Sequence, residues 1–273
     1  MSKIYAFANQ KGGVGKTTTC VNVAASLSVL GKRVLLADLD AQGNATMGSG
    51  IDKSALAFSM NDLLQGEATV EQVLIAQTPA GYDLIPSNSD LTAAEVALLK
   101  KTDKEQILTK ILEPLLDKYD FILLDCPPSL SMLTVNALVA SHAVVIAMQC
   151  EYYALEGLSD LCNTITQLQS TLNPDLYILG IVRTLYDGRN RLSSEVSNQL
   201  IEHFGNTVFQ TVIPRNVRLA EAPSYGLPIC LYERTSRGAS AYLALANELL
   251  KRHDKKNSEP VQNIRIMEAD IHE

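Results

Sequence analysis

The residues from Lys11 to Thr18, Lys-Gly-Gly-Val-Gly-Lys-Thr-Thr, have the types and spacing of a phosphate-binding loop. Three glycines let the backbone fold tightly, so that successive N–H groups can point at phosphate oxygens. A helical pattern opens near Lys16, and the positive end of its dipole adds to the attraction. We expect Lys16 to reach the β- and γ-phosphates of a nucleotide and the Thr17 hydroxyl to bind Mg²⁺. The predicted phosphate-binding residues are Lys11, Gly12, Gly13, Val14, Gly15, Lys16, Thr17 and Thr18.

The loop departs from the usual spacing G-x-x-x-x-G-K-[ST] at its first position. That pattern places a glycine at position 10, where this chain has Gln10, and a second lysine, Lys11, stands near the start of the loop. A lysine held beside bound phosphates can stabilise the γ-phosphoryl transition state. The alternative interpretation of Lys11 is a solvated loop lysine.

Carboxylates at two strand ends complete a candidate nucleotide site. Asp38 and Asp40 end an apolar run and point to the same side because strand side chains alternate with period two. Asp125 ends the apolar run Phe-Ile-Leu-Leu, which is the form of an acidic residue that helps to hold magnesium. The carboxyl edge of an α/β sheet is where ligands bind, although an aspartate at a strand end can also be a turn residue.

Short apolar runs alternate with longer helical patterns, which predicts an α/β fold with a doubly wound, mostly parallel sheet flanked by helices. The predicted strands are Ile4–Ala8, Arg33–Asp38, Tyr82–Ile85, Phe121–Asp125, Ala143–Met148, Leu176–Val182 and Val208–Ile213. The predicted helices are Lys16–Leu30, Lys104–Asp117, Leu155–Leu172, Ser194–Phe204 and Gly238–His253. Pro114 should interrupt the second helix. We expect one domain over residues 1–253 and a polar, partly mobile tail over 254–273.

Composition narrows the class of protein. Of 273 residues, 47% are hydrophobic and 19% charged, which is enough apolar material for a large core. The net charge of −7 argues against a basic nucleic-acid coat. Five cysteines without a C-x-x-C pair fit reduced thiols in a cytosol, and no apolar run approaches the length of a spanning helix. We therefore expect a cytoplasmic protein.

Five separated motifs together resemble the ParA/Soj chromosome-partitioning ATPases, a deviant Walker A group that also contains MinD and the nitrogenase iron protein. The resemblance covers about residues 1–252. The motifs are the loop with its extra lysine, Asp38-Leu-Asp-Ala-Gln-Gly-Asn44, Asp125-Cys-Pro-Pro-Ser129, Glu151-Tyr-Tyr-Ala-Leu-Glu-Gly157 and Ile213-Pro-Arg-Asn-Val-Arg-Leu219.

The resemblance implies that ATP, with Mg²⁺, drives formation of a sandwich homodimer, and that ATP is hydrolysed slowly to ADP until a ParB-like partner stimulates the reaction. It implies that Lys11 crosses to the partner's phosphates, that Asp40 orients the attacking water, and that Asp38 lies near the metal. It makes Asp125 the Walker B acid. Pro214, Arg215 and Asn216 are implied to lie near the adenine.

Arginines concentrate in the last third of the chain. Residues 176–252 contain eight arginines and one lysine against six acidic residues, a local balance of +3. This balance suggests a surface for a DNA backbone, although such arginines often form ordinary ion pairs. The resemblance implies non-specific contact of Arg189 and Arg218 with double-stranded DNA, and hence nucleoid association. The arginines counted with them include Arg183, Arg191, Arg215, Arg234 and Arg237.

Three alternatives remain open from the sequence. A MinD-like membrane switch needs a basic amphipathic C-terminal helix, which the acidic segment 263–273 disfavours, so we expect no stable membrane association. An iron–sulfur reductase needs a ligand pair that Cys126 does not find in Cys150 or Cys162. A positioning ATPase for a plasmid or a protein compartment is not distinguished from one that moves a chromosome. Because the loop begins within the first dozen residues, we expect the short chromosomal type.

Overall fold

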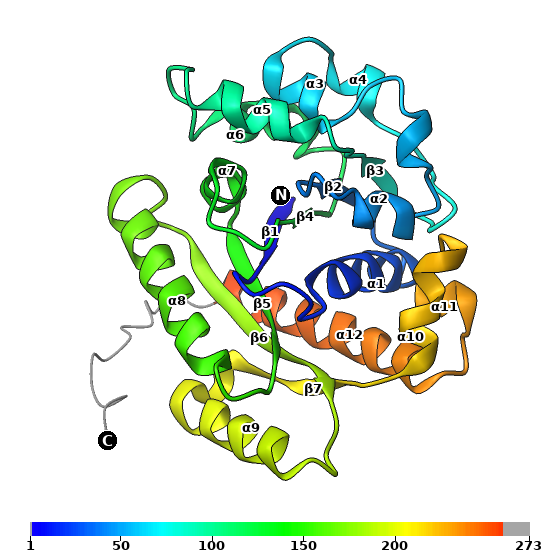
Figure 1. Cartoon of the computed structure of the whole chain (residues 1–273), viewed down its shortest axis with the longest axis vertical. Coiled ribbons are helices and arrows are strands. Elements are labelled where there is room, and N and C mark those ends of the chain that lie inside the picture. Colours follow the sequence, from blue (N-terminus) through cyan, green and yellow to red (C-terminus); the bar gives the residue numbers. More distant parts are fainter. Residues whose placement is uncertain (1, 259–273) are drawn as a thin grey trace.

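The computed structural model, which describes residues 2–258, contains a sheet of seven parallel strands (Figure 1). The strands are β1 Lys3–Ala8, β2 Val34–Asp38, β3 Asp83–Ile85, β4 Phe121–Asp125, β5 Ala143–Gln149, β6 Tyr177–Tyr186 and β7 Val208–Pro214. Their order across the sheet is β3-β2-β4-β1-β5-β6-β7. The chain therefore starts at the centre, winds to one edge and then builds the other, which confirms the predicted doubly wound fold.

Alternation along each central strand divides the core into two layers. In β1, Ile4, Ala6 and Ala8 face one hydrophobic cluster, while Tyr5 and Phe7 face the other. All five are buried, as expected for parallel strands covered on both faces. The sheet is therefore the middle layer of three.

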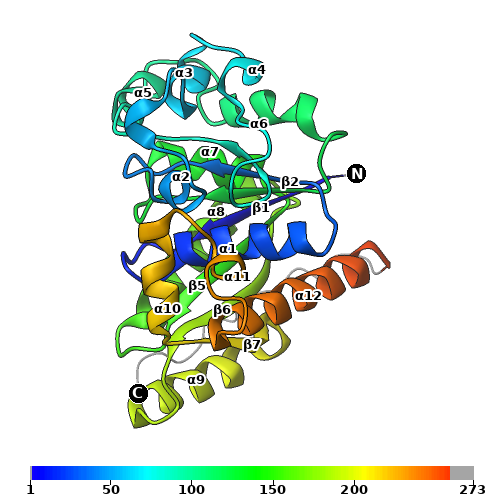
Figure 2. The same ribbon diagram turned by 90° about the vertical axis from the view of Figure 1, so that its right-hand side faces the viewer.

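Helices cover both faces of the sheet (Figure 2). Helices α3 to α9 pack on one face, and α1 and α2 together with α10 to α12 pack on the other; α1 and α12 lie side by side in both views. The α-helices are α1 Lys16–Val29, α2 Asn44–Gly48, α3 Met60–Gln65, α4 Val70–Val73, α5 Leu91–Leu98, α6 Ile107–Leu112, α7 Met132–Ala140, α8 Ala154–Thr171, α9 Arg191–Phe204, α10 Val217–Glu221, α11 Ile229–Tyr232 and α12 Arg237–Ser258. The short 3-10 helices are Lys53–Ala55, Glu113–Leu115, Gly205–Thr207 and Ala222–Tyr225.

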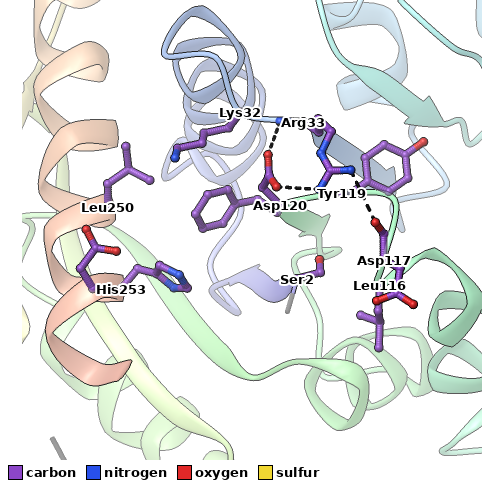
Figure 3. A pocket seen from close by; sticks show the side chains of 11 residues that line it. Ser2, Lys32, Arg33, Leu116, Asp117, Tyr119, Asp120, Leu250 and His253 are labelled. Carbon is purple, nitrogen blue, oxygen red and sulfur yellow. Dashed lines mark hydrogen bonds and ion pairs between the residues drawn. The ribbon is translucent and has the colours of Figure 1, made fainter. Parts of the chain in front are cut away.

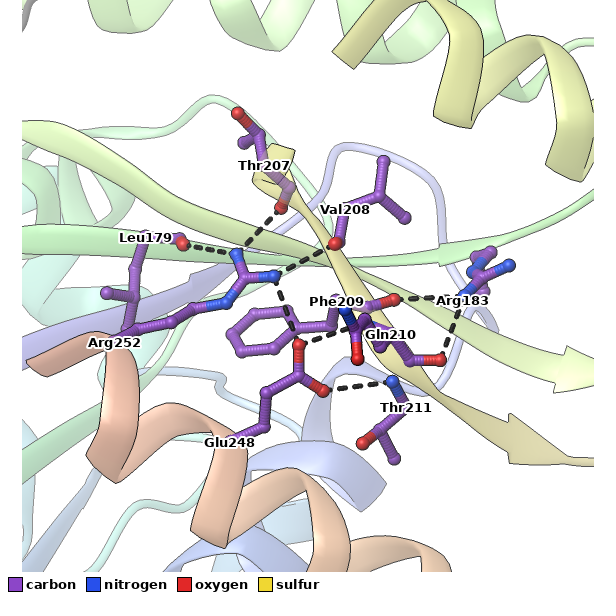
Figure 4. Close-up of polar contacts among 9 residues, drawn as sticks. All are labelled: Leu179, Arg183, Thr207, Val208, Phe209, Gln210, Thr211, Glu248 and Arg252. Atoms are coloured by element: carbon purple, nitrogen blue, oxygen red, sulfur yellow. Dashed lines mark hydrogen bonds and ion pairs between the residues drawn. The ribbon is translucent and has the colours of Figure 1, made fainter. Parts of the chain in front are cut away.

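Helix α12 is hydrogen-bonded to the start of the edge strand β7 through Arg252 (Figure 4). The guanidinium donates hydrogen bonds of 2.9–3.0 Å to the carbonyls of Leu179, Thr207 and Val208. It also lies 3.9 Å from the centroid of the Phe209 ring, a cation–π contact. Arg252, counted among the cationic residues of a surface, is thus a structural residue of the β6–β7 edge.

One turn earlier in α12, Glu248 also binds the edge strand β7. Its carboxylate accepts hydrogen bonds from the backbone N–H groups of Gln210 and Thr211 at 2.8 and 2.9 Å, beside a shift in the β6–β7 register. A side chain at Gly180 would collide with the Phe209 ring, so close packing requires glycine there.

Three predicted elements differ from the observed ones by four residues or more at one end. Within residues 2–258, seven short helices were not predicted, namely α2, α3, α4, α5, α7, α10 and α11. Strand β6 continues to Tyr186, four residues beyond the prediction, because its polar end is buried and hydrogen-bonded. The predicted helix 104–117 is wrong in extent: α6 begins at Ile107, and a 3-10 turn replaces it at Glu113, next to Pro114. Helix α12 reaches Ser258, five residues past its predicted end, so the remaining predicted tail, 259–273, lies outside the described residues.

A cavity of about 330 Å³ opens at the amino ends of β1 and β4 (Figure 3). Lys32, Arg33 and Asp120 line it from one side and His253 of α12 from another. Arg33 is paired with Asp120 there at 2.8 Å. Because the phosphate loop follows the carboxyl end of β1, this cavity lies at the opposite end of the sheet from that loop.

Candidate nucleotide site

The loop between β1 and α1 takes its shape from glycines in left-handed backbone conformations. Gly13 has φ +75° and Gly15, the N-cap of α1, has φ +83°. Other residue types are strained at such angles. No side chain caps the first turn of α1 and no acidic residue lies in it, so its N–H groups keep their capacity to bind an anion.

Lys16 is buried at the start of α1, with 6% of its surface exposed. Its ammonium donates one hydrogen bond, of 3.4 Å, to the Lys11 carbonyl. Burial lowers the pKa of Lys16, and the nearby charge of Asp125 opposes that shift. A buried ammonium with so little local hydrogen bonding suits an anionic ligand in the loop.

Lys11 lies at the outer edge of the loop and pairs with Glu151. Its Nζ is 2.6 Å from Oε2 of Glu151, and both side chains are 44% exposed. The loop backbone is fixed below it, because the Lys11 N–H donates a 2.9 Å hydrogen bond to Oδ1 of Asn9. Lys11 therefore has a carboxylate partner in this structure, while its side chain stays partly solvated.

The sheet register brings the two predicted acidic clusters together. Asp38 of β2 and Asp125 of β4 are paired positions at the carboxyl ends of neighbouring strands, and Phe7 of β1 is paired with Asp125 on the other side. Both aspartates are fully buried. Two carboxylates thus lie side by side beneath the phosphate loop.

Asp125 has unmet bonding capacity. Neither of its carboxylate oxygens accepts a hydrogen bond of ordinary geometry within the described residues, and the Thr17 hydroxyl lies only near enough to affect its pKa. Burial, and then the adjacent charge of Asp38, raise the pKa of Asp125 well above its usual range, and the Thr17 hydroxyl and the Lys16 ammonium oppose the shift. A buried carboxylate without partners is costly, and a cation supplies what it lacks.

Asp38 is already engaged by its own chain. Its Oδ2 accepts 2.8 Å hydrogen bonds from both the backbone N–H and the hydroxyl of Thr46, and its Oδ1 accepts one of 3.1 Å from the Asp40 N–H. Burial raises its pKa to about 6, although these hydrogen bonds lower it. Asp38 therefore holds the start of α2, which sequence reasoning did not find.

Asp40 lies in the loop that follows β2 and is half-buried. Its Oδ1 accepts a 2.9 Å hydrogen bond from the Gln42 N–H, and its carbonyl accepts one of 2.9 Å from the Ser87 hydroxyl. The carboxylate is close enough to Lys16 and Asp125 to influence the pKa of both. Asp40 thus reaches the site with one oxygen left available.

The Pro214–Asn216 motif lies at the same edge of the sheet. Arg215 is exposed, and its N–H donates a 3.0 Å hydrogen bond to the carbonyl of Tyr186, the last residue of β6. Asn216 caps α10, because its Oδ1 accepts a 2.8 Å hydrogen bond from the Arg218 N–H. The motif therefore helps to fix the backbone at the carboxyl ends of β6 and β7.

Thr184 is a residue of the site that sequence reasoning missed. Its hydroxyl donates a 2.6 Å hydrogen bond to the carbonyl of Val14 and so anchors the loop to β6. It is 1% exposed. A lone threonine in an apolar run carries no sequence signal of that role, since only the pairing of β6 beside β5 brings it to the loop.

The predicted DNA-binding arginines are exposed but paired. The Arg189 side chain is 91% exposed and makes hydrogen bonds of 3.0 and 2.9 Å to the two oxygens of Asp187. Arg218 is 55% exposed and is 2.8 Å from Glu221. Arg189 lies in the loop between β6 and α9, and Arg218 lies in α10, the helix that follows β7.

Arg183 does not belong to an exposed surface, and counting it there was wrong. It is 8% exposed, and its guanidinium donates a 3.0 Å hydrogen bond to the hydroxyl of Ser197. It also donates to the carbonyls of Phe209 and Gln210 at 2.9 and 3.1 Å (Figure 4). Two of its acceptors belong to β7, beside the shift in the β6–β7 register. The exposed arginines of this region are Arg189, Arg191, Arg215, Arg218, Arg234 and Arg237.

Comparison with known proteins places this site in a family. A family model described as an AAA domain matches residues 2–178. The chain is 51% identical over 249 residues to the sporulation initiation inhibitor protein Soj of Bacillus subtilis, covering 91% of this chain and 98% of that protein. It is 45% identical over 252 residues to the chromosome partitioning protein ParA of Caulobacter vibrioides, covering 92% and 94%.

Solved structures agree. A structure described as a Mycobacterium smegmatis cobyrinic acid a,c-diamide synthase with bound ADP and magnesium is 38% identical, with a TM-score of 0.82 and coverage of 94% and 97%. The Pyrococcus furiosus cell division ATPase MinD is 28% identical, with a TM-score of 0.76 and coverage of 92% and 99%. Given these similarities over nearly its whole length, the chain belongs to the ParA/Soj family of chromosome-partitioning P-loop ATPases.

Proposed function

We propose that this protein is an ATP-dependent dimerisation switch that binds DNA without sequence preference and hydrolyses ATP slowly. A ParB-like partner stimulates hydrolysis, and the cycle segregates chromosome or plasmid DNA at the nucleoid. The names of the Soj and ParA relatives support the partitioning role. The observation that carries the nucleotide-dependent part is the pair of unpartnered oxygens of Asp125 beneath a glycine loop that also buries Lys16.

The cofactors are ATP or ADP and Mg²⁺. Lys16 and the N–H groups of the loop bind the phosphates, while Thr17 and Asp125 hold the metal ion. Within residues 2–258 no group of three His, Cys, Asp or Glu side chains could hold a metal by itself. That fits Mg²⁺, which is commonly bound through one or two protein oxygens together with phosphate oxygens and water.

Hydrolysis is slow in a single protomer because the chain offers no strong base. Asp40 orients the attacking water, and positioning and electrostatics supply the remaining rate. Lys11 stabilises the phosphates of the partner protomer once it leaves Glu151. Tyr152 and Tyr153 follow Glu151 with 73% and 69% of their surfaces exposed, as expected of side chains that a second copy covers.

DNA binds across the arginines that follow β6 and β7. The exposed guanidinium groups of Arg189 and Arg218 contact phosphates without reading bases, so binding is non-specific. Dimerisation doubles this surface. Affinity therefore depends on ATP and falls with salt.

The second candidate function is a MinD-like switch at a membrane, because the MinD ATPase shares this fold and 28% of the sequence. In the part of the chain that the structure describes, no helix is long and apolar enough to cross a membrane. Sedimentation with vesicles of anionic phospholipid separates the two functions: ATP-dependent co-sedimentation supports the membrane switch, and its absence together with DNA binding supports partitioning.

The dimerisation cycle is tested by two variants. Asp40→Ala should keep ATP bound and run at twice the 29.7 kDa monomer mass, because the water is no longer oriented. Lys16→Ala should lose roughly 10- to 150-fold or more in nucleotide affinity, because a charge-assisted hydrogen bond is removed. Light scattering during size-exclusion chromatography with ATP or ADP measures both. An Asp40→Ala protein that stays monomeric with ATP would overturn the role of Asp40.

A further inference from the structure

Each arginine proposed to contact DNA is already held by a carboxylate of its own chain. Asp187 binds Arg189 through three hydrogen bonds, one from the backbone N–H and two from the guanidinium, at 2.9–3.1 Å. Glu221 binds Arg218 at 2.8 Å and also accepts a 3.2 Å hydrogen bond from the Tyr232 hydroxyl. A carboxylate presents two oxygens to a guanidinium much as a phosphate does.

The fold brings Asp187 against Arg189 and near Arg215. Leu185, with φ +49°, bends the end of β6, and the 3.0 Å bond from the Arg215 N–H to the Tyr186 carbonyl brings the start of α10 beside it. Arg189 lowers the pKa of Asp187 to about 2, and the charge of Arg215 contributes to that shift. Asp187 is therefore ionised at neutral pH, bonded to the Arg189 guanidinium and near enough to Arg215 for that charge to act on it.

These ion pairs contribute little to folding. Arg189 is 91% exposed, and the Asp187 side chain is 33% exposed. Such pairs change an equilibrium by only about 1.4- to 5-fold. Their larger effect is on surface charge: six exposed arginines and five acidic residues lie between 187 and 237, which leaves a balance of only +1 per protomer. The acidic residues are Asp187, Glu195, Glu202, Glu221 and Glu233.

We propose that Asp187 competes with DNA phosphates for Arg189, and that Glu221 competes with them for Arg218. This competition keeps the DNA affinity of each protomer low. This inference rests on the proposed function. A phosphate must displace the carboxylate before it reaches the guanidinium. One protomer then binds DNA weakly. A dimer, which adds the contacts of two protomers, binds DNA more tightly. The carboxylates thereby make DNA binding conditional on ATP.

Asp187→Asn tests the competition and keeps the turn, because the amide oxygen still accepts the Arg189 N–H. The variant should bind a random-sequence duplex with ATP about 2- to 30-fold tighter than the wild type, which is the effect of one exposed ion pair counted once in each protomer. Fluorescence anisotropy at fixed salt measures the affinity. Binding with ADP should also rise.

Glu202→Gln is the matched control, since it removes one exposed negative charge from the far end of α9. Glu202 lies 11 residues, or about 16 Å, along the helix from Arg191, beyond the screening length of about 8 Å at physiological salt. The gain in DNA affinity of Glu202→Gln should be smaller than that of Asp187→Asn. In an Arg189→Ala background, Asp187→Asn should give no more than the control gain.

Two results would overturn the inference in distinguishable ways. If the wild type binds DNA with ATP and Asp187→Asn gains no more than Glu202→Gln, the competition is wrong and the proposed function stands. If neither the wild type nor the variant with both Asp187→Asn and Glu221→Gln binds DNA while an ATP dimer forms, the DNA-binding part of the proposed function falls, and the inference falls with it.

Discussion

Asp125 is the residue whose surroundings fit the account of the nucleotide site most closely. It is fully buried, its two oxygens lack partners among the described residues, and it is paired in the sheet with a second buried carboxylate, Asp38. Without a cation the ionised pair opposes folding, because both charges are desolvated and repel each other. The site thus gives up stability for the capacity to bind a metal ion.

The sign of the resulting pH dependence follows from the raised pKa values. The pKa of Asp38 is raised to about 6, and that of Asp125 is also raised. The two protonated carboxyl groups contribute fully to the free energy of unfolding below the ordinary pKa of an aspartate, near 4. This contribution is lost as the pH rises through the pKa of the folded state. Asp125→Asn should therefore raise the free energy of unfolding at pH 8 by about 1–3 kcal/mol.

Urea unfolding of the nucleotide-free protein at pH 5 and pH 8 measures this effect. The gain should be smaller at pH 5, and Mg²⁺ with ATP should no longer stabilise the variant as it does the wild type. Asp160→Asn, on the exposed side of α8, is the control and should change neither value by more than about 0.5 kcal/mol. An Asp125→Asn protein less stable than the wild type at pH 8 would contradict this account.

At the scale of elements, β6 does more positioning than its central apolar run indicates. Arg183 donates hydrogen bonds to β7, Thr184 holds the phosphate loop through Val14, and Tyr186 accepts the hydrogen bond from the Arg215 N–H. One strand therefore connects the loop, the predicted adenine motif and the proposed DNA surface.

Thr184→Val tests the anchor from β6. It keeps the side-chain shape but leaves the Val14 carbonyl without its 2.6 Å hydrogen bond. ATP affinity should fall by about 2- to 13-fold, the worth of one hydrogen bond, because the loop is less well held. Isothermal titration measures the affinity, and Thr184→Ser, which keeps the hydroxyl, should stay near the wild-type value. Equal affinities for the valine and serine variants would remove Thr184 from the site.

Apolar runs and loop chemistry predict much of this fold. The seven strands, the α1 start at Lys16 and the acidic ends of β2 and β4 follow from them. The end of β6 does not, because Arg183 and Thr184 are polar and only their buried partners make them strand residues. The helices α3, with its Ser59–Asp62 capping box, and α7 were not predicted either. They are short elements that tertiary packing stabilises.

Site geometry is harder to predict than site membership. The spacing of Asp38 and Asp40 indicates an acidic strand end, but it does not show that Thr46 donates two hydrogen bonds to one oxygen of Asp38. Nor does it show that the oxygens of Asp125 stay without partners among the described residues. Likewise, Arg183 and Arg189 look alike in sequence. Long-range pairing of β6 with β7 buries the first and leaves the second exposed.

At the scale of the whole molecule, the sheet separates two ends with different chemistry. The carboxyl end carries the phosphate loop, the buried carboxylates and the exposed arginines. The amino end carries the cavity bordered by Lys32 and His253. Because the proposed nucleotide and DNA surfaces share one end, a dimer formed through that end can couple ATP binding to DNA binding.

The most direct test is binding of the wild-type protein to a random-sequence duplex with ATP, with ADP and without nucleotide, at 50 and 200 mM salt. We predict tight binding only with ATP. Arg189 and Arg218 of two protomers give at least four phosphate contacts, so affinity should fall roughly 100-fold or more between the two salt concentrations. Equal binding in all three nucleotide states, or none with ATP, would contradict the account.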